Sequence, residues 1–255
     1  MVSHHTAAWG AEPQENAVTQ PTHPEKTTGR RIAGPLKTWY DLHEALAHEV
    51  TGIAADAGAL TLDGLDDFAT RFWAFDRELR AHSEVEDGIM FPAIADRGGD
   101  IEAHLGQEHR DEQLAVYAVG AALLHANAIR SPEALSALGA PAAALRDSLL
   151  AHLEFEEATA LTQVDDLFTD DEQAALFRTI IGSLPPDPGL QPWVTAALSP
   201  EHLEARLRNI ASSMSTPALT DLMTQIHAGV STDTWAVVEA RTPELAGLVS
   251  ARAGS

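Results

Sequence analysis

The chain has 255 residues, and 45% hydrophobic with 21% charged residues is the composition of a globular protein, which excludes disorder of the whole chain. Sixteen Lys and Arg against 38 Asp and Glu give a formal net charge of −22. Phosphate backbones and anionic lipid repel such a polyanion, so we expect neither nucleic acid nor a membrane as partner. The absence of cysteine excludes disulfides, thiolate catalysis and iron–sulfur clusters, and directs attention to the 12 histidines.

Residues 1–35 are predicted to be a disordered tail. The stretch Ala11–Arg31 is rich in Pro, Thr, Gln and Glu and has almost no aliphatic residues, so it cannot build a core. Met1–Gly10 lacks the basic-then-apolar order of a secretory signal. No apolar run approaches the ~20 residues of a spanning helix. We therefore expect a cytoplasmic protein without a membrane segment.

From Leu36 onward, apolar residues recur three and four positions apart, which predicts long amphipathic helices. The predicted helices cover residues 36–60, 65–95, 101–128 and 131–164, and Ser131 before Pro132 is the predicted N-cap of the last one. A proline inside the last of them predicts a kink or break at Gly139–Pro141. Long helices joined by short loops predict an all-α fold, an up-down-up-down four-helix bundle over residues 36–164.

Residues 165–255 are predicted to form a C-terminal extension of short helices. Thr169 to Glu172 matches a capping box that begins a helix ending near Ile181. Ser199-Pro200 begins another, and further short helices are expected near residues 217–228 and 232–241. Between the first two, the proline-rich stretch 184–189 predicts an extended linker. Because these helices are short, we expect the extension to pack on the bundle rather than fold alone.

One histidine falls on the apolar stripe of each long helix when successive residues are placed 100° apart: His43, His82, His109 and His152. Glu86 and Glu156 follow two of these histidines by four residues and share their stripes. The same count places Ile89 and Ala93 on the stripe of Glu86, and Gln113 on the stripe of His109. A buried glutamate is costly unless it is paired, hydrogen-bonded or bound to a metal, and no Lys or Arg matches these two. We predict that the six residues bind two metal ions. Glu154 and Glu157 project about 160° and 140° away from His152, so a change to Gln at either position should have little effect. Imidazole and carboxylate donors without thiolate suit iron or manganese and accept zinc.

Three other residues have a weaker claim to the site. His104 also precedes a glutamate by four residues, but it lies roughly 140° around the helix from His109 and is taken as a chance match. Glu78, one turn before His82, is either an acceptor for an imidazole N–H or a solvated charge. Tyr40, one turn before His43, is either a donor to bound oxygen or a core aromatic.

The order of these residues resembles the hemerythrin-like family of four-helix di-iron proteins. The resemblance covers about residues 36–164 and rests on His43, the segment HSEVEDGIMFP at 82–92, the pair Glu108-His109 and the segment HLEFEE at 152–157. The segment LQPWV at 190–194 and the helices after it resemble the extension of many actinobacterial members. The resemblance implies two iron ions bridged by Glu86 and Glu156. It also implies a reaction with dioxygen, peroxide or nitric oxide, with or without a small organic substrate.

One departure from the family's oxygen carriers bears on function. Their third helix carries an HxxxH pair, whereas Leu105 and Gln113 stand four residues either side of His109 here. A missing ligand leaves a more open iron, so we expect a di-iron oxidoreductase of the oxygenase, oxidase or peroxidase type. The alternatives are a non-catalytic carrier or sensor of oxygen, nitric oxide or iron, and a metal-free helical interaction protein. A ferritin-like centre is not favoured, because no histidine has Glu three residues before it.

Overall fold

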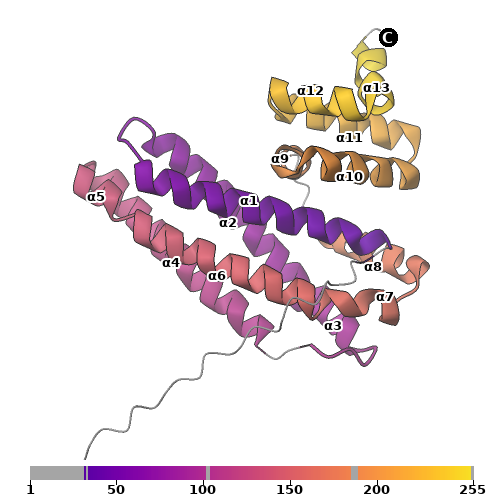
Figure 1. Cartoon of the computed structure of the whole chain (residues 1–255), viewed down its shortest axis with the longest axis horizontal. Coiled ribbons are helices and arrows are strands. Elements are labelled where there is room, and N and C mark those ends of the chain that lie inside the picture. The colour runs from indigo at the N-terminus through magenta and orange to yellow at the C-terminus, as the bar shows by residue number, and fades with distance from the viewer. Residues whose placement is uncertain (1–31, 33, 102–103, 185–188, 254–255) are drawn as a thin grey trace, which may run out of the picture.

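The computed structural model describes residues 32, 34–101, 104–184 and 189–253, and every regular element within them is a helix (Figure 1). None of the helices in these ranges combines the length and the apolarity needed to cross a bilayer. The four long helices are α1 (Thr38–Ala59), α2 (Leu65–Val85), α4 (Leu105–Ile129) and α6 (Gly139–Ala158). Helices α1 and α4 each pack against both α2 and α6, so the four surround a common core.

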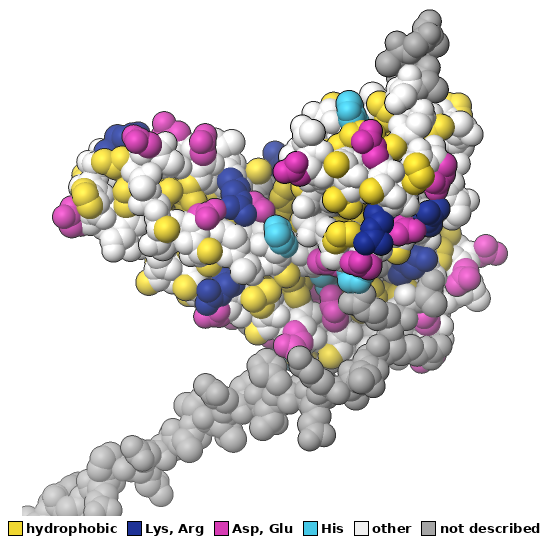
Figure 2. All heavy atoms as spheres, turned by 45° about the horizontal axis from the view of Figure 1, so that its top comes forward, with side chains coloured by type: hydrophobic (Ala, Val, Ile, Leu, Met, Phe, Trp, Pro, Cys, Tyr) yellow, Lys and Arg dark blue, Asp and Glu magenta, His cyan; other side chains and the backbone are white. Residues whose placement is uncertain are grey.

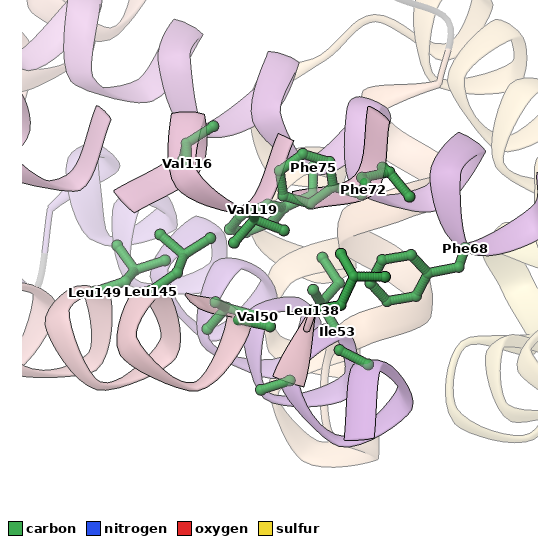
Figure 3. Close-up of a cluster of buried hydrophobic side chains, with 14 of the residues drawn as sticks. Val50, Ile53, Phe68, Phe72, Phe75, Val116, Val119, Leu138, Leu145 and Leu149 are labelled. Carbon is green, nitrogen blue, oxygen red and sulfur yellow. The ribbon is translucent and has the colours of Figure 1, made fainter. Parts of the chain in front are cut away.

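The predicted apolar stripes face this core. Each long helix contributes side chains to one buried cluster, and aromatic rings from α2 fill its centre (Figure 3). Labelled members are Val50 and Ile53 from α1, Phe68, Phe72 and Phe75 from α2, Val116 and Val119 from α4, and Leu138, Leu145 and Leu149 at or in α6. A second buried cluster, around Trp39, Phe91 and Leu161, closes the other end of the bundle.

The second predicted helix contains a π-helical segment that the sequence reasoning missed. This segment, η2 (Glu86–Met90), joins α2 to α3 (Phe91–Ala95). The Phe91 amide donates to the Glu86 carbonyl, five residues back. Pro92 has no N–H to donate, so a wider turn just before it accommodates the proline without ending the helix.

The π-segment shifts the buried face of this helix by one residue. The predicted stripe ran from Glu86 to Ile89 and Ala93, but these two apolar residues are only partly buried. Met90 and Ile94 are fully buried in their place. A π-turn adds one residue to a helical turn, so an unbroken 100° count gives the wrong phase beyond Glu86.

The fourth predicted helix is broken at Ala137–Leu138, directly before the predicted position. It starts with α5 (Pro132–Ser136), capped by the Ser131 side chain as predicted, and a turn separates α5 from α6. Pro141 lies in the first turn of α6, where a missing N–H removes no intrahelical bond. Helix α6 also ends at Ala158, and the predicted end near 164 instead holds η3 (Leu161–Gln163) and α7 (Val164–Leu167).

The N-terminal tail was predicted to end at residue 35, and residues 1–31 lie outside the described part of the chain. Ile32 is only 5% exposed, and η1 (Pro35–Lys37) continues into α1. Ile32 and Leu36 share the second buried cluster with Ile180, so the packed chain begins slightly earlier than predicted.

The last five helices of the described chain form a lobe that stands out from the bundle (Figures 1 and 2), whereas the helix before them packs on the bundle's second buried cluster. Helix α8 (Asp170–Ser183) has the predicted capping box. It is followed by α9 (Leu190–Ala197), α10 (Pro200–Ser213), α11 (Thr216–Gly229), α12 (Thr232–Arg241) and α13 (Pro243–Ala253), of which α9 and α13 were not predicted as separate helices. Helices α9 to α13 share an apolar cluster of their own, to which α1 adds Ala45. Helices α9 and α10 contact α1. The predicted linker falls mostly on residues 185–188, outside the described ranges.

Candidate metal centre

The six predicted residues meet in the interior of the bundle. His43, His82, His109 and His152 come from α1, α2, α4 and α6 respectively, and none is more than 6% exposed. Glu86 begins the π-segment, Glu156 lies in α6, and both are 0% exposed.

Four of these residues form a first group of donor atoms, with all ligand atoms within 4.8 Å of one another: His43, His82, Glu86 and Glu156. His82 Nε2 lies 3.2 Å from Glu86 Oε1. His43 Nε2 is 3.6 Å from Glu86 Oε1 and also 3.6 Å from Glu156 Oε2. Two imidazoles and two carboxylates therefore point at one small volume.

A second group joins Glu86 to His109 and His152. His109 Nε2 lies 3.2 Å from Glu86 Oε2, which is the carboxylate oxygen that does not face His43 and His82. The Nε2 atoms of His109 and His152 are 3.1 Å apart, and His152 Nε2 is 3.8 Å from Glu156 Oε2. The two oxygens of Glu86 thus face different histidine groups, as a carboxylate that spans two ions would.

Several of these buried atoms have no hydrogen-bond partner. His43 Nε2, His82 Nε2 and both oxygens of Glu156 form no hydrogen bond to any described residue. Each unsatisfied buried polar atom costs about 1–3 kcal/mol. Nitrogen and oxygen donors that converge without protein partners fit metal ions as the missing partners, and this donor set is one that iron, manganese and zinc accept.

The charges of the metal-free chain are already arranged around Glu86. Burial opposes ionisation of Glu86, but His82, His109 and His43 outweigh it and hold its pKa well below the usual value. Burial lowers the pKa of His43, yet Glu156, Glu157 and Glu86 raise it to about 10. His43 therefore carries a proton at neutral pH, and a metal ion that binds there must displace it.

Three further ligand candidates, His109, His82 and Glu156, have shifted pKa values. Burial would lower the pKa of His109, but Glu86 and Asp87 raise it to about 9. Burial lowers the pKa of His82 to about 3, so this imidazole is neutral and ready to act as a ligand. Burial and the charge of Glu86 raise the pKa of Glu156 well above its usual value.

Carboxylates on the far side of three imidazoles fix their orientation. His43 Nδ1 lies 3.1 Å from Glu157 Oε1, and His152 Nδ1 lies 2.9 Å from Glu108 Oε2. Both contacts reach across to a neighbouring helix. With Nδ1 committed to an outer carboxylate, Nε2 is the nitrogen left for a metal, and such partners tune the affinity of a site.

Two further contacts complete this outer layer. His109 Nδ1 lies 3.0 Å from Asp87 Oδ1. The Trp39 indole N–H donates to Glu86 Oε1 over 2.6 Å, which fixes the carboxylate shared by the two groups. His82 is the exception among the histidines, because its Nδ1 has no hydrogen-bond partner within the described ranges.

The sequence reasoning missed these outer residues. It treated His104–Glu108 as a chance match, and it expected Glu157 to project away from the site. Glu108 and Glu157 do project away from the histidine on their own helix, but each contacts a histidine on a neighbouring helix: Glu108 contacts His152, and Glu157 contacts His43. A helical wheel contains no signal for a contact between helices.

Glu112 is the buried acid that the sequence reasoning overlooked. It is 2% exposed, its Oε1 lies 3.9 Å from His152 Nδ1, and neither oxygen has a hydrogen-bond partner among the described residues. Burial raises the pKa of Glu112 to about 7. A polar pocket of about 440 Å³, lined in part by His109, Glu112 and Arg110, adjoins it. The spacing of buried residues 109, 112, 116, 119 and 123 was the signal, whereas the prediction had placed Gln113 on this stripe.

The three weaker candidates, Glu78, Tyr40 and His104, lie outside the two donor groups. Glu78 is buried, accepts a 2.6 Å hydrogen bond from Arg77 and makes none with His82 Nδ1. Tyr40 is buried within the second apolar cluster. His104, with its side chain 46% exposed, lies outside both donor groups as predicted.

A comparison with family models gives one match. The model described as Hemerythrin, Hemerythrin HHE cation binding domain, matches residues 34–164, just over half of the chain. The matched range contains all six convergent residues and the four long helices. No curated protein and no solved structure matches the chain.

Proposed function

The chain belongs to the hemerythrin HHE cation-binding family, and from this membership we propose that it is a non-heme di-iron protein with an up-down-up-down bundle. The observation that carries the proposal is the division of six buried donors into two groups that share Glu86. His43 and His82 would hold one ion, His109 and His152 the other, and Glu86 and Glu156 would bridge them. Manganese or zinc would fit the same donors.

We propose further that the protein is an oxidoreductase. When bound, the two irons would supply redox chemistry toward dioxygen, peroxide or nitric oxide. Six protein ligands shared by two ions leave coordination positions for a small molecule. The chain's own residues keep the imidazoles oriented through Glu108, Asp87 and Glu157, and hold Glu86 through Trp39.

The position of Glu112 supports turnover over simple oxygen carriage. Helix α4 presents one histidine to the site and, one turn later, a buried carboxyl group beside His152. That carboxyl lines the polar pocket together with His109. A protonatable group in this position suits a reaction that consumes protons, which reversible oxygen binding does not require.

Anaerobic loading with Fe(II) followed by exposure to air tests the proposal. We expect two irons per chain, then irreversible oxidation with consumption of dioxygen. A stable oxygen-bound spectrum that reverses under vacuum would instead show a carrier. At most one ion per chain after reconstitution would contradict the dinuclear site.

Histidine variants on α4 supply the matched control. His109→Ala should lower the metal content, because His109 belongs to the second donor group. His104→Ala, five residues earlier and outside both groups, should leave it unchanged. Equal losses in the two variants would contradict the assignment of His109.

A further inference from the structure

The outer face of α4 carries an apolar strip. Leu114, Tyr117 and Leu124 are 64%, 56% and 61% exposed. Together with the exposed Ala121 and Ala128 they follow a spacing of three and four residues, which places them along one side of the helix. Single exposed apolar residues are ordinary, but a contiguous row of them marks an interaction surface.

A tryptophan from α2 widens this strip. A Cβ atom at Gly120 would lie 2.9 Å from the ring of Trp73, so the glycine is what lets the ring pack against α4. Trp73 is nevertheless 42% exposed. The apolar surface therefore extends from α4 onto α2.

The described helices leave the strip uncovered. Helix α4 makes its main contacts with α2, α5 and α6. The C-terminal helices contact α1, which lies diagonally across the bundle from α4, and the lobe stands on the other side of the molecule (Figure 1). A partner that covers the strip must therefore come from outside this packing.

The strip is free of formal charge, although the chain has a net charge of −22. The eight exposed residues within 114–129 include no Asp, Glu, Lys or Arg. Two copies of such a polyanion repel each other over most of their surfaces. An uncharged face is where two copies can approach with the least repulsion.

The charged residues at the two ends of the strip suit an antiparallel pair of copies. Arg110 and Asp111 precede the strip, Arg130 and Glu133 follow it, and all four are exposed. These positions lie nearly equally far from Ala121 along the sequence. In an antiparallel pair centred there, Arg110 comes near Glu133 of the second copy, and Asp111 comes near Arg130 of the second copy. Each charge then meets the opposite sign.

The same register matches large side chains with small ones. Leu114 falls opposite Ala128 of the second copy, and Leu124 falls opposite Ala118 of the second copy. Ala121 faces its own counterpart, so the two helices can approach closely at the centre. The strip is therefore complementary to itself in both charge and size.

We infer that α4 binds the α4 of a second copy of this chain, antiparallel to it, about a two-fold axis near Ala121. One patch that meets itself is the interface of a two-fold dimer. The strip is about 24 Å long and one helix wide, which is less area than the ~800 Å² that each partner buries in a standard interface. We therefore expect a dimer that dissociates on dilution. The inference is independent of the metal centre, because none of the six donors lies in the strip.

Sedimentation velocity of the full chain, from micromolar to submillimolar concentration, tests the dimer. The sedimentation coefficient should rise from that of a monomer to that of a dimer. Leu124→Glu changes a side chain that is 61% exposed, so it should leave the fold intact and remain monomeric over the same range. Ile181→Glu, at an apolar position of α8 that is 49% exposed, is the matched control and should still dimerise.

Two results of this experiment would overturn the inference. One is a monomer at every concentration, as expected if a different protein or another segment of the same chain covers the strip. The other is a dimer that persists in Leu124→Glu, which would place the interface elsewhere.

Single cysteines test the orientation, because the natural chain contains none. Ala121→Cys should form a disulfide-linked dimer under mild oxidation, since the two thiols meet at the axis. Ala128→Cys lies about 10 Å along the helix from the axis, which leaves the two thiols roughly 20 Å apart, so it should not cross-link. Cross-linking of Ala128→Cys to the same or a greater extent than Ala121→Cys would overturn the antiparallel arrangement.

Discussion

Glu86 and Glu156 each face imidazoles from more than one helix, and in the proposed di-iron site they would bridge the two ions. Two divalent ions at short separation repel one another, and anionic bridges offset that repulsion. Glu86→Gln or Glu156→Gln should therefore lower the metal content from two ions toward one, with affinity losses of at least ~10–100-fold. Elemental analysis measures this directly. Glu154→Gln, at an exposed position of the same helix, is the control.

Glu157→Gln should affect metal binding differently from Glu86→Gln and Glu156→Gln. The sequence alone predicted little effect of Glu157→Gln, but the 3.1 Å contact with His43 Nδ1 changes that expectation. The variant should weaken metal binding by ~10-fold or more while two ions still bind at saturation. If Glu157→Gln loses an ion and Glu156→Gln keeps both, the carboxylate ligand lies five residues after His152 and not four.

The six convergent residues could be predicted because each lies on the apolar stripe of its own helix. A period of 3.6 residues is a local property of the chain, and it needs no knowledge of neighbouring helices. The partners of the imidazoles could not be found in this way. Glu108 meets His152 and Glu157 meets His43 only because α4, α6 and α1 pack side by side.

At the scale of elements, the π-segment decides which residues beyond Glu86 are buried. Ile94 is fully buried, whereas Ile89, which the regular count had placed inside, is partly exposed. Ile94→Ala should cost about 2–5 kcal/mol of unfolding free energy, and Ile89→Ala should cost clearly less. Urea unfolding of the two variants compares them with the same chemical change. A larger loss for Ile89→Ala would mean that the helix continues through Pro92 without the wider turn.

The capping box of α8 gives a prediction for pH. The Thr169 N–H and Arg97 lower the pKa of Glu172 from its usual 4.5. A carboxyl group whose pKa is lowered on folding contributes its full stabilisation above the unfolded value and loses it as the pH falls through the folded one. Glu172→Gln should therefore reduce amide-exchange protection in the first turn of α8 at pH 7 and have little effect at pH 3. An equal reduction at both values would show that the charge of Glu172 is not what stabilises the cap.

The N-terminal caps of the helices were more predictable than the exact positions of helix breaks. Ser131, Thr169 and Ser199 were recognised as caps because their side chains act on the next few residues, and all three accept the expected amide. The break lies just ahead of the predicted Gly139–Pro141, because proline disrupts a helix interior but is tolerated in the first turn of α6.

At the scale of the whole molecule, α1 serves two apolar clusters at once. Leu46 lies in the bundle core, while its neighbour Ala45 is buried in the cluster of the C-terminal helices. Polar contacts reinforce this junction, because Glu44 accepts from the Ser199 amide over 3.0 Å and pairs with His202. The sequence could not reveal the arrangement, since a small apolar residue beside a core leucine has no signature of its own.

Ala45→Glu should therefore separate the two parts of the molecule. Ala45 is 0% exposed, so a carboxylate at this position would be buried without a partner against apolar side chains. The free-energy cost of such burial exceeds the stabilisation that the apolar contact between α1 and the C-terminal helices provides. We expect a larger radius of gyration in small-angle scattering and faster amide exchange in α9 and α10, with two metal ions still bound, because all six donors lie on the bundle side. Ala55→Glu, on an exposed turn of the same helix, should change none of these. A compact Ala45→Glu chain with unchanged amide exchange in α9 and α10 would mean that Glu44, with the Asp41–Arg206 pair, holds the C-terminal helices without the apolar contact.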